Sequence, residues 1–271
     1  MRAFIPYKIT VILIAFFAFI SCEKVIELDI GQAEETVVVD AVISNLPNQS
    51  IIRLSKSNPL FSSDPYTFLS DASVRIKNNH GESFLFPESE PGVYTLDDFK
   101  GIEGLEYQLD IEWKDIKINA SSKMPKTVAI DSIELVVTPS RFTQNDEYIF
   151  SLKVHFTDPL DETNYYRFDI FKNDSLYNGF VVSNDLFYNG LTTYQFFMNQ
   201  EMQTQDTICV QLSCIDKANY SYFLVLGQLD SPFIIAPGNP VSNLKGNAIG
   251  FFGAYAQSRK YFIVPDIDTI L

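Results

Sequence analysis

The chain has 271 residues and carries 34 acidic against 20 basic residues, a net charge of −14 at pH 7. This acidity disfavours a nucleic-acid partner, because phosphate binding requires clustered Lys and Arg, and it also disfavours electrostatic docking on anionic lipid. Aromatic residues make up 14% of the chain, which excludes a disordered protein and indicates buried aromatic surface.

The first 22 residues have the pattern of an export signal. Arg2 and Lys8 form a basic start, and the apolar run Ile9–Ile20 follows. This run is shorter than the ~20 residues that span a bilayer. Cys22 stands directly after the small residue Ser21, which is typical of a lipoprotein signal. We therefore predict that residues 1–21 are removed and that Cys22 is the lipid-attachment site, followed by a tether over 22–35.

Residues 36–125 are predicted to form the first folded domain. Short β-branched or alternating runs are separated by turn residues, which is typical of antiparallel β-sandwiches. We expect an immunoglobulin-like β-sandwich. Its predicted strands lie at 36–43, 50–55, 72–77, 83–86, 91–96, 107–113 and 116–120.

Residues 126–271 are predicted to form a second, larger β-sandwich-type domain, so the fold class is all-β. The segment 121–126, with Pro125, is the predicted link. A helix is expected at 217–229, with Asp216 as its N-cap and Pro232 beyond its end. Strands are expected at 130–137, 147–156, 165–171, 177–182, 193–198 and 207–215, and two closing strands at 248–255 and 259–264.

Cys209 and Cys214 lie in the strand predicted at 207–215. Five residues of strand span roughly 16 Å, and the odd offset places the two side chains on opposite faces. An oxidising compartment permits a disulfide, but a bridge here requires a bend between the cysteines. We favour two packed free cysteines.

The sequence favours no catalytic site. It has no Gly-x-Ser-x-Gly elbow. His80 stands in a predicted turn, and His155 alternates with apolar residues in a predicted strand. Asp158, Asp161 and Glu162 share a loop in which acids can bind calcium or perform glycosidase chemistry, but solvated turn acids are the simpler interpretation. We expect no enzyme, no cofactor and no metal site.

Adjacent aromatic residues offer a candidate binding surface. Phe187 and Tyr188 are flanked by Asn184-Asp185 and Asn189-Gly190, which indicates a loop tip. Exposed rings suggest an interface. We therefore treat Phe187 and Tyr188 as candidate binding residues.

Several segments of the chain match a known family in order and spacing: Cys22–Asp29, Val37–Ile43, Asp71–Ile76, Gly92–Tyr94, Gly104–Leu109, Asn164–Phe168 and Ser242–Tyr255. Together they resemble a family of Bacteroidota outer-membrane lipoproteins catalogued as domain of unknown function 4249. Their order and spacing carry the likeness over nearly the whole mature chain. One departure is Leu244, where the family often has Ile.

The resemblance implies a lipid-anchored, mostly β envelope protein, often encoded beside a TonB-dependent outer-membrane receptor. It implies no catalytic residues. Our first hypothesis is a non-catalytic accessory on the outer membrane, facing either the cell surface or the periplasm, that assists such a receptor in nutrient capture or uptake. A structural or adhesive surface lipoprotein is the alternative, and a hydrolase with a carboxylate site is a weaker one.

Overall fold

The structure is a computed structural model that describes residues 36–58, 67–139, 148–229 and 238–266. The predicted signal, the tether and the lipid site Cys22 lie outside the described residues. No helix in the described segments is long and apolar enough to cross a bilayer.

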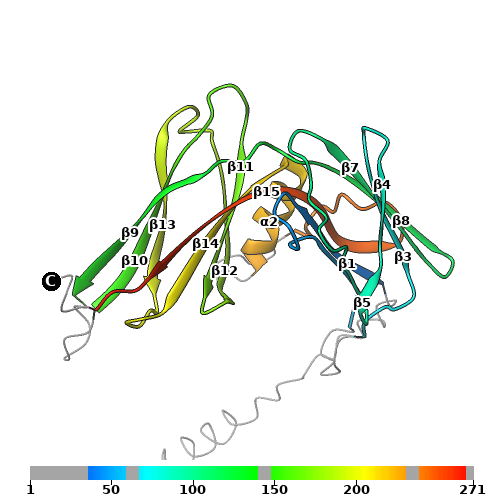
Figure 1. The fold of residues 1–271 in the computed structure, drawn as a ribbon, viewed down its shortest axis with the longest axis horizontal. Coiled ribbons are helices and arrows are strands. Elements are labelled where there is room, and N and C mark those ends of the chain that lie inside the picture. Colours follow the sequence, from blue (N-terminus) through cyan, green and yellow to red (C-terminus); the bar gives the residue numbers. More distant parts are fainter. Residues whose placement is uncertain (1–35, 59–66, 140–147, 230–237, 267–271) are drawn as a thin grey trace, which may run out of the picture. The chain divides into compact units, whose positions relative to one another are not determined.

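The described segments are mostly β, with fifteen strands and one helix (Figure 1). This confirms the predicted β-rich chain, and the helix α2 (Lys217–Leu229) has the predicted bounds. The strands are β1 (Val37–Ser44), β2 (Ile51–Lys56), β3 (Ser73–Asn78), β4 (Ser83–Phe86), β5 (Glu88–Glu90), β6 (Val93–Tyr94), β7 (Glu106–Trp113), β8 (Ile116–Lys123), β9 (Ile130–Pro139), β10 (Tyr148–Thr157), β11 (Tyr165–Lys172), β12 (Ser175–Asn184), β13 (Thr192–Gln200), β14 (Thr207–Ile215) and β15 (Ala248–Ile263).

The described strands form three sheets. The largest has eight strands in the order β12-β11-β14-β15-β1-β2-β6-β5. A three-stranded sheet has the order β13-β10-β9, and a four-stranded sheet the order β4-β3-β7-β8. Buried apolar residues from all three sheets form one hydrophobic cluster.

Strand β15 joins the two halves of the eight-stranded sheet. Its first half, Ala248–Tyr255, pairs in parallel with β1, and its second half, Ala256–Ile263, pairs antiparallel with β14 (Figure 1). The prediction of two closing strands was therefore wrong. Gly250 permits the close approach to β1, because a Cβ there would lie 1.9 Å from the carbonyl oxygen of Val39, and its φ of 109° disfavours any other residue.

The predicted boundary between residues 36–125 and 126–271 separates strands that are hydrogen-bonded to each other in the structure. Strand β1 comes before this boundary and pairs with β15, which comes after it. The predicted link does not start at residue 121, because β8 continues to Lys123. The described residues all belong to one compact unit, and a division into two folding domains stays a prediction.

Helix α2 begins at the predicted cap. The backbone N–H of Asn219 donates to Oδ1 of Asp216 at 2.8 Å, as expected for an N-cap aspartate. The other carboxylate oxygen of Asp216 accepts a hydrogen bond from the Ser122 hydroxyl at 2.6 Å, which ties the helix start to β8. Phe223 of the helix packs in a second apolar cluster with Phe251 and Tyr255 of β15.

Strand β14 is buried on both faces. Ile208, Val210, Leu212 and Cys214 point into the main hydrophobic cluster. The opposite face carries Cys209, Gln211, Ser213 and Ile215, which are also buried. The second face of β14 therefore carries buried polar side chains beside apolar ones.

Candidate functional site

The predicted tip residue Phe187 projects into solvent, with 89% of its surface exposed. Three more large apolar side chains are exposed on the same pair of loops. They are Leu160, Leu186 and Leu191. We call these four residues the apolar tip.

Tyr188 points inward, unlike Phe187. Its ring packs edge-on against Phe156, with 5.9 Å between the ring centroids, and its hydroxyl lies 3.0 Å from that of Ser183. Burial raises the pKa of Tyr188 to about 12. Tyr188 therefore anchors the loop that presents Phe187, and a binding role for either residue stays a prediction.

Two buried carboxylates fix the loops of the apolar tip. Asp158 accepts the backbone N–H of Gly190 at 2.9 Å and the hydroxyl of Tyr166. Asp185 accepts the backbone N–H of Asn164 at 2.7 Å. Each of these backbone hydrogen bonds joins one loop to the other, so the contacts give the tip a defined shape.

The other residues considered from the sequence are dispersed in the structure. His80 lies in the turn between β3 and β4, whereas His155 lies on β10 with its Nε2 atom 3.3 Å from Glu134. Glu162 pairs with Lys126 at 2.8 Å. Within the described segments, no group of three or more His, Cys, Asp or Glu side chains is placed to hold a metal ion.

Cys209 and Cys214 are buried free cysteines, as the strand geometry predicts. Their side chains lie on opposite faces of β14. Burial raises the pKa of the Cys214 thiol to about 12 and also raises that of Cys209. Both thiols are therefore poor nucleophiles at neutral pH.

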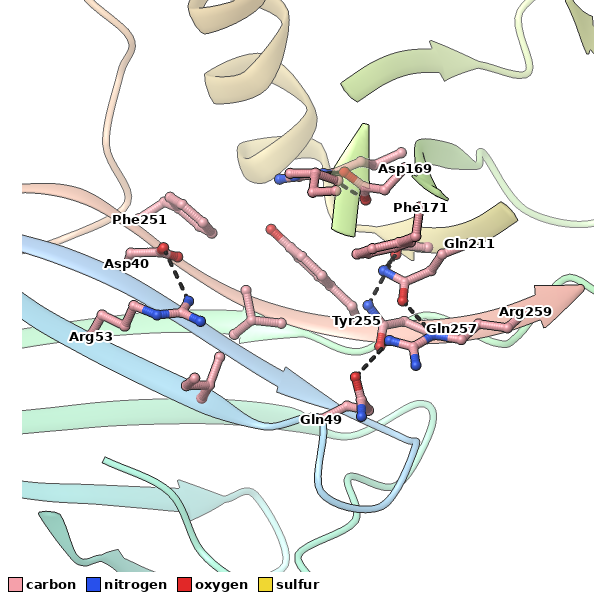
Figure 2. A pocket seen from close by; sticks show the side chains of 15 residues that line it. Asp40, Gln49, Arg53, Asp169, Phe171, Gln211, Phe251, Tyr255, Gln257 and Arg259 are labelled. Atoms are coloured by element: carbon pink, nitrogen blue, oxygen red, sulfur yellow. Dashed lines mark hydrogen bonds and ion pairs between the residues drawn. The ribbon is translucent and has the colours of Figure 1, made fainter. Parts of the chain in front are cut away.

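A groove that the sequence did not reveal lies on the second face of the eight-stranded sheet (Figure 2). We call it the sheet groove. Its volume is about 320 Å³, and its walls combine apolar side chains with arginine, aspartate and amide groups from β1, β2, β11, β14 and β15. Its polar lining residues are Asp40, Gln49, Arg53, Arg167, Asp169, Gln211, Ser213, Gln257 and Arg259.

The polar residues of the groove lie in rows across neighbouring strands. Arg167 of β11 faces Ser213 of β14, which faces Gln257 of β15. Two residues along, Asp169, Gln211 and Arg259 form a second row. Residues at i and i+2 share one face of a strand. The pattern polar-x-polar in three separate strands was the available signal, but it identifies a site only once the register is known.

Arg167 and Asp169 form a buried ion pair at one side of the groove. Nη2 of Arg167 lies 2.9 Å from Oδ1 of Asp169, and Nε lies 3.1 Å from both carboxylate oxygens. The guanidinium carbon lies 4.7 Å from the centre of the Phe180 ring and 4.3 Å from that of Phe223. Burial opposes the charge of Arg167, but Asp169 keeps its pKa raised.

Arg259 lies between two neutral amides. Its Nε donates to Oε1 of Gln211 at 2.7 Å, and its Nη2 donates to Oε1 of Gln49 at 2.6 Å (Figure 2). The ring of Phe171 lies 5.8 Å from the guanidinium carbon. These contacts orient Arg259 without neutralising its charge.

A chain of hydrogen bonds supports the groove from β1 to β14. The Ser44 hydroxyl donates to Oε1 of Gln257 at 2.6 Å, and Nε2 of Gln257 donates to the Ser213 hydroxyl at 3.1 Å. Tyr255 is fully buried, which raises the pKa of its hydroxyl well above the usual value, and it donates to Oδ1 of Asn219 at 3.1 Å. These hydrogen bonds fix the positions of Gln257, Ser213 and Tyr255, which line the groove.

The sequence matches the model of a known protein family. The model of a domain of unknown function, DUF4249, matches residues 23–261. The chain belongs to the DUF4249 family.

The match starts directly after Cys22 and covers all residues that line the sheet groove, from Asp40 to Arg259. The apolar tip also lies within it. Both surfaces are therefore parts of the DUF4249 domain itself. No curated protein matches this DUF4249 chain.

Proposed function

We propose that this DUF4249 chain is a non-catalytic, lipid-anchored accessory of the outer membrane that assists a TonB-dependent receptor in nutrient capture or uptake. The apolar tip is the observation that carries the proposal. Exposed apolar side chains that gather on neighbouring loops often mark an interaction site, and hydrogen bonds to two buried carboxylates join the two loops that carry these residues. The predicted signal with Cys22 supports the anchor, and the family resemblance supports the receptor.

The receptor contact is tested by capture from the outer membrane. The chain is produced in its own bacterium with an affinity tag, cross-linked, solubilised in detergent and analysed by mass spectrometry. The proposal expects recovery of a TonB-dependent receptor. Phe187→Ser should reduce this recovery by about tenfold or more, because exposed aromatic residues contribute strongly to interfaces.

Leu85→Ser is the matched control, because Leu85 is an exposed apolar residue on β4, outside the apolar tip. It should leave the recovery unchanged. If the unsubstituted chain captures no receptor, the accessory role is wrong and a structural or adhesive role is favoured.

The anchor has its own test. In a Cys22→Ala chain, acylation at this position is abolished, so the protein should leave the membrane fraction. Retention of Cys22→Ala in that fraction would contradict lipid attachment at Cys22.

We also infer that the three sheets are arranged as β-sandwiches, the first of them immunoglobulin-like. The shared apolar cluster and the alternating burial along β3 and β8 support this inference. An experimental structure that shows the three- and four-stranded sheets packed on other elements than the eight-stranded sheet would contradict it.

A further inference from the structure

We propose that the sheet groove binds a small organic molecule with a single carboxylate, and that Arg259 is the residue that recognises the carboxylate. The inference deepens the proposed function and rests on it for the role of the molecule as a nutrient. Binding in the groove and docking through the apolar tip are separate measurements, so either one can fail without the other.

The charges of the groove leave Arg259 uncompensated. Arg167 is paired with Asp169, and Arg53 lies 3.5 Å from Asp40. Within the described segments, Arg259 has no carboxylate at ion-pair distance, and its hydrogen-bond partners Gln211 and Gln49 are neutral.

The geometry of Arg259 suits a carboxylate. A guanidinium has five N–H donors in a planar fork, of which Gln211 and Gln49 accept two, and the hydroxyl of Tyr261 lies against the same guanidinium. The remaining donors match the two oxygens of a carboxylate. The amides also hold the side chain in one orientation, which reduces the entropy lost on binding.

The position of Arg259 makes it accessible to a ligand. It lines the sheet groove and also a second hollow of about 190 Å³. Gln49 and Phe171 line both spaces with it. The carboxylate is therefore expected at the junction, with the body of the ligand along the sheet groove.

The other side chains of the groove determine which chemical groups the ligand can carry besides its carboxylate. Ile51, Phe171 and Leu176 give the groove an apolar side, and Gln211 and Gln257 supply amides. A volume of about 320 Å³ suits a small molecule rather than a polymer.

Nearby acids limit the charge of the ligand. Asp40 and Asp169 line the same groove, and Asp174 lines the second hollow. Asp40 and Asp169 are paired with Arg53 and Arg167, so Asp174 is the acid that opposes an added negative charge, and it opposes a doubly charged anion more strongly than a singly charged one. The groove is therefore suited to a monocarboxylate and not to phosphate.

The test measures binding of N-acetyl amino acids, from N-acetyl-glycine to N-acetyl-phenylalanine, to the full chain purified in detergent. Each acid is titrated beside its amide, which has the same shape but no negative charge, and beside inorganic phosphate. Titration calorimetry or ligand-observed NMR gives the dissociation constants. At least one acid should bind about tenfold or more tightly than its amide and than phosphate.

Arg259→Gln should weaken binding of that acid by about tenfold or more, and Arg259→Lys should restore part of it, because lysine keeps the charge but loses the planar fork. Arg75→Gln is the control, because Arg75 is an exposed arginine on β3. Circular dichroism confirms that each variant is folded. The proposal is overturned if no acid binds, if acid and amide bind equally, if phosphate binds as tightly, or if folded Arg259→Gln keeps the affinity.

Discussion

Replacing Asp169 by Asn tests the buried ion pair that connects the sheet groove with helix α2. The side chains of Arg167 and Asp169 are only 17% and 6% exposed, and three hydrogen bonds join them. Loss of the carboxylate leaves the Arg167 charge buried without compensation. Breaking a buried pair in this way costs about 3–5 kcal/mol of unfolding free energy.

Urea unfolding of the full chain in detergent, followed by circular dichroism, measures this loss. In a domain of this size the same loss lowers Tm by about 6–20 °C. Asp110→Asn is the matched control, because Asp110 pairs with Lys77 at 2.7 Å but the two side chains are 34% and 48% exposed. It should cost about 1 kcal/mol or less.

A double variant shows whether stability is lost because one charge is left buried without a partner or because the ion pair itself is missing. Asp169→Leu combined with Arg167→Met removes both charges, so no buried charge is left unpaired. It should be more stable than Asp169→Asn alone. The reasoning is refuted if Asp169→Asn costs no more than Asp110→Asn, or if the double variant is the less stable one.

Two further predictions concern the backbone and pH. Gly250→Ala should lower the free energy of unfolding by more than about 3 kcal/mol in urea, because the added Cβ meets the Val39 carbonyl. Gly179 also has a positive φ but has open space around it, so Gly179→Ala should cost only about 1–2 kcal/mol. Equal losses in the two variants contradict the argument that β1 approaches Gly250 too closely for a side chain. Burial raises the pKa of Tyr188 to about 12 and that of Tyr255 well above its usual value. These tyrosines ionise near pH 10 in the unfolded chain, so their contribution to the free energy of unfolding is complete below pH 10. It is lost as the pH rises from 10 toward 12, by about 1.4 kcal/mol per pH unit for each tyrosine. A free energy of unfolding that stays constant from pH 9 to pH 11.5 contradicts this.

Local signals in the sequence predicted individual elements well. Strand β14 and helix α2 have the predicted bounds. The β-branched and apolar run of the strand, the cap Asp216 and the apolar helix positions are all encoded within a few residues of one another. The same kind of local pattern placed Phe187 at a loop tip.

Features that depend on pairing between distant strands were not predictable. Gln257 and Ser258 interrupt the apolar pattern of the last strand, so two strands were expected. In the fold, Gln257 bonds with Ser44 and Ser213, and the Ser258 hydroxyl donates to the carbonyl of Val128 at 2.8 Å. Polar residues that satisfy each other across a sheet resemble a loop when the sequence is read locally.

The sheet groove was missed for the same reason. Its two rows of polar residues are aligned only by the register of β11, β14 and β15. Arg167, Gln211 and Arg259 look like isolated polar residues within their own strands. Their common site is a property of the sheet and not of any one segment.

The parallel pairing of β1 with β15 has a consequence for how the chain folds. Val37, at the start of the described chain, pairs with Ala248 near its end. Contacts between such distant residues form slowly, because a long loop must close before they are made. Until β15 arrives, β1 presents an unpaired apolar edge that invites association with other chains. Loss of the last strand should therefore lead to aggregation, and folding should be completed only after the whole chain has been released.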